Sequence, residues 1–257
     1  MDGDYSHSES GSHSESGGQS NSGKSALKIA GIVAASLVAL AFVCCGGAAF
    51  LGDRALSEIR LAGGGVEGSG VPTVQERMVR DFTGIETDGL IDVDVTIGDD
   101  WSVMLRADDN ILPLISTEVS GGTLVFSSRG SFNARTALHA TVVMPAIDHV
   151  EASGLGDVTI VGVRAAVLTV EVGGTGNIVA DGTVEALTVT VTGMGDARLA
   201  GLIAKTGEVH VRGMGDATVH VTDTLDARVE GMGDIIYSGD PTVESVIDGM
   251  GEVTPAR

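Results

Sequence analysis

Apolar and polar residues alternate along most of the second half of the chain, and a Gly-x-Gly unit interrupts the alternation at regular intervals. A period of two residues is typical of β-strands with one buried face, so each unit predicts a corner between two strands. When the six units are aligned, three mainly apolar columns emerge. They are Val150, Val170, Val189, Val209, Ala227 and Ser245; Ala152, Val172, Val191, Val211, Val229 and Ile247; and Val158, Ile178, Ala197, Ala217, Ile235 and Val253.

Successive units lie 20, 19, 20, 18 and 18 residues apart. One corner signature in each period of about 20 residues indicates a solenoid. A helical solenoid would need apolar spacings of three and four, and each glycine in a helix interior would cost ~1 kcal/mol. We therefore predict an all-β, single-domain parallel β-helix with about 18–20 residues per coil, in which equivalent columns stack at ~4.8 Å.

The corner residues are expected to be structural. Glycines would supply the positive φ of a tight corner, and the acid or amide that follows would accept hydrogen bonds from backbone N–H groups two residues on. Calcium binding by these acids stays open, although one corner per coil is a sparser pattern than that of calcium-binding repeats. The set comprises Gly154, Gly156 and Asp157; Gly174, Gly176 and Asn177; Gly193, Gly195 and Asp196; Gly213, Gly215 and Asp216; Gly231, Gly233 and Asp234; and Gly249, Gly251 and Glu252.

Four of the residues between the paired glycines are methionines, namely Met194, Met214, Met232 and Met250. They either pack inside the corner or face solvent. Stacked exposed thioethers would form an adaptable apolar ridge suited to a partner, and this is the interpretation we favour.

Residues 79–150 show similar but less regular patterns, such as the strict alternation from Ile91 to Ile97. At ~19 residues per coil, residues 79–257 would form about nine coils and a rod of roughly 45 Å.

The N-terminal part of the chain has a different composition. Residues 1–25 are rich in Ser, Gly, His and acids and predict a disordered tail. Residues 26–52 contain 23 consecutive uncharged residues, 29–51, which as a helix of roughly 34 Å would cross a membrane. Residues 53–78 then predict a flexible linker.

The apolar segment is interpreted as a signal anchor that leaves the long C-terminal domain outside the cytoplasm. A cleaved signal peptide is the main alternative because Gly47, Ala48 and Ala49 offer small residues for cleavage. A lipoprotein site at Cys44 is a further alternative. Two basic residues flank each end of the segment, so charge does not decide the orientation.

Charge and composition exclude several classes of function. A formal net charge of -20 leaves no basic surface for nucleic acid. The only cysteines, Cys44 and Cys45, are adjacent and predict neither a disulfide framework nor a zinc site. Residues 18–25 fit the P-loop pattern, but no buried strand precedes them, so we expect no nucleotide to bind and assign no cofactor.

Chemistry on the predicted solenoid is sparse. Arg198, Arg212 and Arg228 come near the corners and would be the basic residues of a polysaccharide lyase, but few aromatic residues accompany them. The four histidines of the domain are expected to face solvent without converging on a metal or a serine. They are His139, His149, His210 and His220. We therefore assign no catalytic, cofactor-binding or metal-binding residue.

The order of several motifs resembles the head GIN domain family, also called auto-transporter adhesins. The matching segments are Phe82-Thr83-Gly84-Ile85, residues 121–125, Met144-Pro145, the Gly-x-Gly-Asp corners and residues 237–241. The resemblance covers about residues 79–255, and it implies a right-handed β-helix outside the cytoplasm and no established enzymatic activity. That family often has Ser between the glycines, where this chain has Leu155, Thr175 and four methionines.

Together these observations predict a membrane-anchored extracytoplasmic β-helix that acts as an adhesion or protein-interaction module. Its partner would be an envelope protein or a glycan. The alternative is a carbohydrate-active enzyme of the polysaccharide lyase kind, or a carbohydrate-binding β-helix on the same scaffold.

Overall fold

The computed structural model describes residues 65–257, which lie in one compact unit, Ala62–Arg257. The predicted tail, the membrane segment 29–51 and the part of the predicted linker up to residue 64 lie outside the described residues. Within residues 65–257, no helix is long and apolar enough to cross a membrane. Residues Val66–Glu67 (β1) and Pro72–Glu76 (β2), in the segment expected to be a linker, form short strands that pair with β8 and β5.

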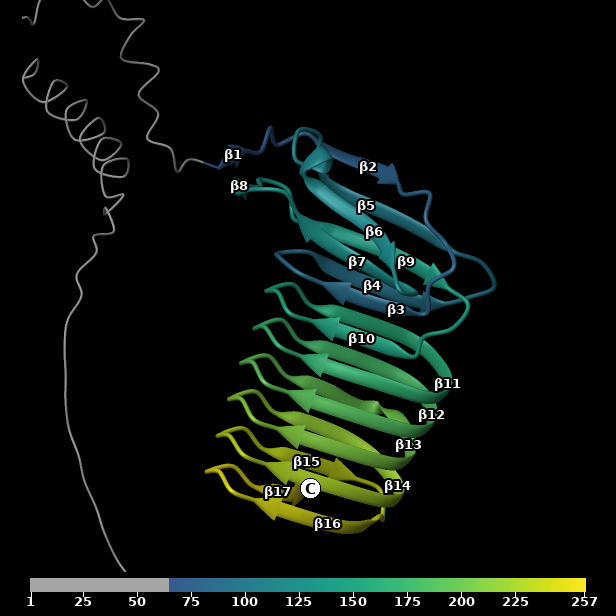
Figure 1. Cartoon of the computed structure of the whole chain (residues 1–257), viewed down its shortest axis with the longest axis vertical. Helices are drawn as coiled ribbons and strands as arrows, with labels where there is room; N and C mark the ends of the chain where they lie inside the picture. Colours follow the sequence, from purple (N-terminus) through teal and green to yellow (C-terminus); the bar gives the residue numbers. More distant parts are fainter. Residues whose placement is uncertain (1–64) are drawn as a thin grey trace, which may run out of the picture. The chain divides into compact units, whose positions relative to one another are not determined.

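The larger part of the unit is a parallel β-solenoid, as the alternation predicted (Figure 1). Each long strand follows one Gly-x-Gly corner, bends, and ends at the next corner, so it contributes to more than one face. The first and last of the six corners enclose about five turns. The strands are β10 (His149–Ala152), β11 (Val158–Val172), β12 (Ile178–Val191), β13 (Ala197–Val211), β14 (Ala217–Val229), β15 (Ile235–Ser238), β16 (Thr242–Ile247) and β17 (Val253–Pro255).

The N-terminal end of the solenoid has a different construction. Strands β3 (Gly84–Thr87) and β4 (Asp92–Ile97) continue the parallel ladders, and β7 (Thr123–Ser128) and β9 (His139–Met144) pair with them. Beyond these, β5 (Ser102–Asp108) runs antiparallel to β9 and β2, and β6 (Ile115–Ser120) runs antiparallel to β7. A short 3₁₀ helix, Leu112–Leu114, and the two-residue strand β8 (Phe132–Asn133) complete this end.

The prediction of about nine coils is therefore wrong for residues 79–150. Strands β6 and β7 are joined by Gly121 and Gly122, which have φ of 59° and 86°. Two consecutive residues with positive φ are typical of the tight turn of an antiparallel hairpin, which a parallel solenoid does not contain. The alternation in this region was correct, but alternation is identical in parallel and antiparallel strands.

The predicted apolar columns form the core. Val150 pairs with Val170, Val170 with Val189, and Val189 with Val209, all in parallel register. Their side chains are fully buried, as are those of nearly all column residues from Val150 to Ile235. Burying each such aliphatic side chain contributes roughly 1.5–3 kcal/mol, so the stacked columns stabilise the solenoid along its length.

A buried carboxylate ties the N-terminal segment to this core. Asp108, at the end of β5, accepts hydrogen bonds from the N–H of Gly70 at 3.1 Å, the N–H of Arg135 at 2.7 Å, and both the N–H and hydroxyl of Thr136. The hydroxyl of Thr136 is the main cause that holds the pKa of Asp108 below its usual value; the backbone bonds add to it and partial desolvation opposes it. The ionised carboxylate is thus part of the fold.

Candidate functional site

The Gly-x-Gly corners stack along one edge of the solenoid, and close approach of the backbone explains their glycines. A Cβ added at Gly176 would lie 2.0 Å from the carbonyl oxygen of Gly156, and one at Gly195 would lie 2.0 Å from that of Gly176. No such contact is possible, so only glycine fits at these positions. Among the described residues, the glycines with positive φ are elsewhere, which makes the predicted positive φ at these corners wrong.

Backbone hydrogen bonds lock each corner onto the preceding one. The N–H of Met194 donates to the oxygen of Gly174 at 2.9 Å, and the N–H of Met214 donates to that of Gly193 at 2.9 Å. The same bond recurs at 2.9 Å for Met232 and at 2.8 Å for Met250. The parallel ladder therefore passes through the corners without interruption, and the residues between the glycines are held in register.

The side chains between the glycines point to solvent and form a mainly apolar strip, which we name the corner ridge. Its five large apolar members are between 51% and 78% exposed, although large apolar residues are usually buried. At the ~4.8 Å spacing of stacked strands, the four methionines extend over ~14 Å. The corner ridge consists of Leu155, Thr175, Met194, Met214, Met232 and Met250.

A second ladder runs beside the corner ridge and is made by the residue after each Gly-x-Gly unit. The carboxylate of Asp157 accepts from the N–H of Asn177 at 2.7 Å, and that of Asp196 accepts from the N–H of Asp216 at 2.9 Å. The remaining members follow the same rule up to Glu252. These bonds connect successive coils, whereas the sequence predicted bonds within each corner; the stacking brings the next amide closer than the one two residues on.

This ladder also bears on metal binding. In each ladder carboxylate or amide from Asp157 to Asp234, one side-chain oxygen accepts from a backbone amide, which reduces its capacity to coordinate a cation. Within residues 65–257, no group of three or more His, Cys, Asp or Glu side chains is placed to hold a metal ion. The geometry favours a structural role for the ladder.

The arginines near the corners lie apart, and two of them are ion-paired. Arg198 is paired with Asp196 at 3.0 Å and Arg212 with Glu230 at 3.2 Å. Arg198 belongs to the face that follows the corner, and Arg228 belongs to the face that precedes it. The three guanidinium groups are thus not brought together around one reacting carbon, as uronate chemistry requires.

The expectation that the histidines face solvent and meet no serine is wrong for His220, and all four histidines are half-buried. The Nδ1 atom of His220 on β14 lies 3.0 Å from the hydroxyl oxygen of Ser238 on β15. The same hydroxyl donates to the carbonyl oxygen of Val219 at 3.3 Å. A nucleophilic site would need a third group that orients the base, and the described residues show no acid bonded to His220. The pair links neighbouring coils.

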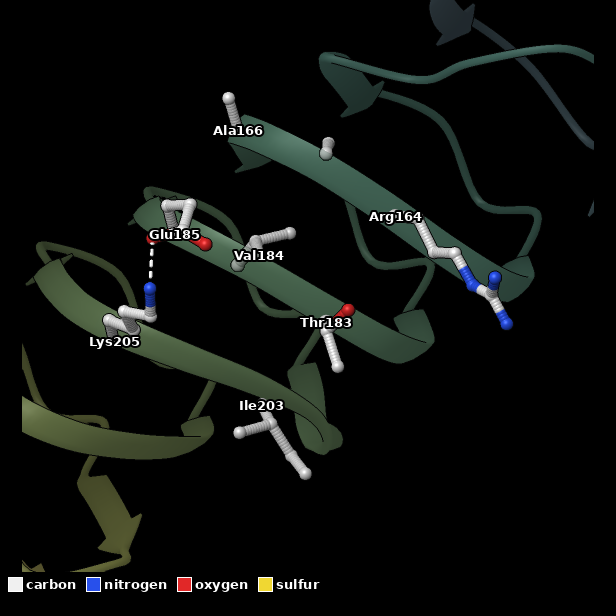
Figure 2. A pocket seen from close by; sticks show the side chains of 8 residues that line it. Arg164, Ala166, Thr183, Val184, Glu185, Ile203 and Lys205 are labelled. Atoms are coloured by element: carbon white, nitrogen blue, oxygen red, sulfur yellow. Dashed lines mark hydrogen bonds and ion pairs between the residues drawn. The ribbon is translucent and has the colours of Figure 1, made fainter.

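An open depression lies on the solenoid away from the corner ridge (Figure 2). Its volume is about 510 Å³, and it is lined by residues of β11, β12 and β13, among them Arg164 and Ile203. Lys205 is bonded to Glu185, and this hydrogen bond and charge raise the pKa of Lys205. A raised pKa is unsuited to proton abstraction, which requires a free amine near neutral pH.

Comparisons with known proteins agree with this architecture. A family model described as "Putative auto-transporter adhesin, head GIN domain" matches residues 81–241. No curated protein matches the chain. A solved "putative adhesin" from Bacteroides fragilis is 24% identical, with a TM-score of 0.63, and the alignment covers 75% of this chain and 100% of that one.

Two further solved structures are more distant. A "putative adhesin" from Parabacteroides merdae is 20% identical, with a TM-score of 0.46, and the alignment covers 76% of this chain and 100% of that one. A "putative lipid binding protein" from Parabacteroides distasonis is 20% identical, with a TM-score of 0.48, and the alignment covers 75% of this chain and 99% of that one.

Proposed function

Because the chain belongs to the head GIN domain family of auto-transporter adhesins, we propose that it is a non-catalytic adhesion or protein-interaction module that contacts its partner through the corner ridge. The family is described as adhesin-like, and the relative from Bacteroides fragilis is called a "putative adhesin". Residues 29–51 would anchor the module in the membrane, and the solenoid would lie outside the cytoplasm.

The exposed methionines are the observation that carries this proposal. An apolar strip held in register by backbone bonds is rigid along the solenoid, yet each thioether side chain can adapt its shape to a partner. Covering the strip would contribute ~25 cal/mol for each Å² of apolar area, before the cost of association. The strip lacks aromatic side chains, which favours a protein partner over a glycan.

The charge of the molecule supports the same assignment. A net charge of -20 repels anionic lipid surfaces, so a solenoid outside an anchor would be kept away from the bilayer. The corner ridge is bordered by the carboxylates of Asp216 and Asp234, whereas Glu230 beside it is paired with Arg212. A partner with apolar residues flanked by basic ones would complement this edge in both shape and charge.

The test compares three forms of the full chain on the surface of producing cells: wild type, a ridge variant and a control variant. The ridge variant carries Met194→Ser, Met214→Ser, Met232→Ser and Met250→Ser. The control variant carries Val161→Ser, Val167→Ser and Ile203→Ser, which remove apolar side chains that are 45–51% exposed away from the corners.

We expect the ridge variant to bind immobilised envelope fragments about tenfold more weakly or worse, which corresponds to a loss of ~1.4 kcal/mol. The control variant should bind as the wild type does. Equal binding by all three forms, with unchanged circular dichroism, would show that the corner ridge is not the contact surface.

A further inference from the structure

The last coil of the solenoid leaves core positions uncovered. In β14, Ala227 and Val229 are fully buried. Their register partners in β16 are Ser245 and Ile247, and both are exposed, Ile247 by 47%. Two of the core columns therefore end in exposed members, Ser245 and Ile247, which no further coil within residues 65–257 covers.

The same strand has an unpaired backbone edge. Within the described residues, β16 pairs with β14 alone (Figure 1). The N–H of Asp248 donates to the oxygen of Val229. In a parallel ladder the backbone groups of successive residues point alternately to either side. The N–H and C=O groups of Val243, Ser245 and Ile247 therefore point away from β14, into the open edge.

Natural proteins usually protect such edges with proline, lysine, a bulge or an inward-pointing charge. The neighbouring edge strand β17 ends in Pro255, which has no N–H to donate. At the opposite end of the solenoid, antiparallel strands β2, β5 and β6 cover the core. Pro241 directly precedes β16, but within the strand, Thr-Val-Glu-Ser-Val-Ile, none of these devices occurs, and its one charge, Glu244, is in the outward-facing set.

We propose that a second copy of this chain pairs with β16 across this open end, to give a two-fold symmetric, antiparallel β16–β16 dimer. In such a dimer the two solenoids continue one another tail to tail, and the core columns of one copy meet those of the other. A two-fold axis makes the interface self-complementary, so one strand sequence must match itself when reversed.

The sequence of β16 matches itself in one register. Residues directly opposite in an antiparallel pair point to the same face. A two-fold axis at Ser245 places Ser245 opposite Ser245 of the second copy and Val243 opposite Ile247, so that all three inward positions meet inward positions.

The neighbouring registers bring like charges together. An axis at Glu244 would place two glutamates directly opposite each other, and an axis at Val246 would place Glu244 opposite Asp248. With the axis at Ser245, Glu244 lies opposite Val246 and Asp248 lies opposite Thr242. Like charges that face each other across a strand pair are destabilising, so the Ser245 register is selected.

Disulfide trapping in the full chain tests both the dimer and its register. Cys44 and Cys45 are first replaced by Ser, and Ser245→Cys or Glu244→Cys is added. Both substituted positions are exposed on the same strand, so each variant serves as the control for the other. Membranes of producing cells are oxidised mildly at high ionic strength, where the repulsion between two acidic copies is screened.

In the Ser245 register, the Cα atoms of the two residues at position 245 lie about 5.5 Å apart, within disulfide range. Residues at position 244 are diagonal neighbours about 7–8 Å apart, beyond that range. We therefore expect Ser245→Cys to give a reducible species of twice the chain mass, at least tenfold more abundant than with Glu244→Cys.

Three results would overturn the proposal: no dimer with Ser245→Cys, equal or greater cross-linking with Glu244→Cys, or an adduct whose mass is not that of two chains. The last result would identify a different protein as the occupant of this edge. Because disulfide trapping reports only on contacts of β16, its outcome is independent of whether the corner ridge binds a partner.

Discussion

Replacing Gly174 by alanine should destabilise the solenoid, whereas the same replacement at the adjacent Gly173 should not. A Cβ at position 174 would lie 1.9 Å from the oxygen of Gly154, whereas the nearest atom to a Cβ at position 173 is the hydroxyl oxygen of Ser153 at 3.5 Å. The second distance is an ordinary van der Waals contact.

The size of the effect follows from what must move. To reach even 3.0 Å, the shortest separation that real Cβ atoms show, the corner has to open by about 1.1 Å, the difference between 3.0 and 1.9 Å. The oxygen of Gly154 accepts from the N–H groups of Thr175 at 3.0 Å and Gly176 at 3.3 Å, and both bonds would be lost. Two hydrogen bonds at ~0.5–1.5 kcal/mol each, with ~1–3 kcal/mol of overpacking, amount to about 2–6 kcal/mol.

Urea denaturation of the full chain in mild detergent, followed by circular dichroism, measures this difference. Gly174→Ala should lower the free energy of unfolding by that amount and Tm by roughly 4–24 °C. Gly173→Ala should leave stability unchanged or raise it by about 0.4–1 kcal/mol, because alanine restricts the unfolded chain. If the two variants unfolded at the same urea concentration, close approach would not be the reason for glycine at the corners.

Three further predictions concern the core, the buried carboxylate and the topology. Val211→Asp should unfold the solenoid because an unpaired charge would lie between stacked coils, while Thr218→Asp on the outer surface should be tolerated; equal thermal shifts would mean that the strand register is wrong by one residue. Folding lowers the pKa of Asp108, so the stability that its carboxylate contributes is present above the unfolded pKa of about 3.9 and is lost as the pH falls through the folded pKa. Asp108→Asn should therefore reduce the difference between the unfolding free energies measured at pH 7 and pH 3. An unchanged difference would contradict this role. A protease added to intact cells should digest residues 79–257, and digestion solely in inverted vesicles would refute the proposed topology.

The solenoid could be predicted from the sequence because its information is local and repeated. Val170, Val189 and Val209 each stand at the same distance from a Gly-x-Gly unit, and equal distances in a stacked fold become contacts. Period and alternation together exclude a helical repeat, so the class of fold follows before any contact is known.

The predictions that are wrong concern two properties that a local sequence pattern does not encode: the relative direction of paired strands and the residue that a side chain contacts in the next coil. The alternation of Leu124, Val125 and Phe126 is the same for a parallel and an antiparallel partner, and β7 has one of each, β3 and β6. The pattern therefore does not separate the hairpin after Ser120 from a further coil; the Gly121-Gly122 pair is the signal that does. The side chain of Asp157 reaches the amide of the next coil, a distance that sequence spacing does not give.

The exposure of residues at the ends of the solenoid could not be predicted from the sequence either. Ser245 and Ile247 fit the same columns as buried residues, and only their position in the last described coil makes them exposed. A repeat pattern predicts which side chains of a coil face the adjacent coil, but not whether an adjacent coil is present. The open edge of β16 is therefore a property of the structure rather than of the repeat.

Methionine oxidation on intact envelopes tests the role of the corner ridge most directly. Brief exposure to peroxide converts accessible methionines to the sulfoxide, and mass spectrometry reads each site in the bound and the purified full chain. Met78, which is 82% exposed and away from the corners, reports general access to peroxide, and the buried Met144 reports unfolding. The account predicts that Met194, Met214 and Met232 oxidise rapidly in the purified chain and are protected on envelopes, while Met78 is not. Equal oxidation of these methionines in both preparations would contradict it.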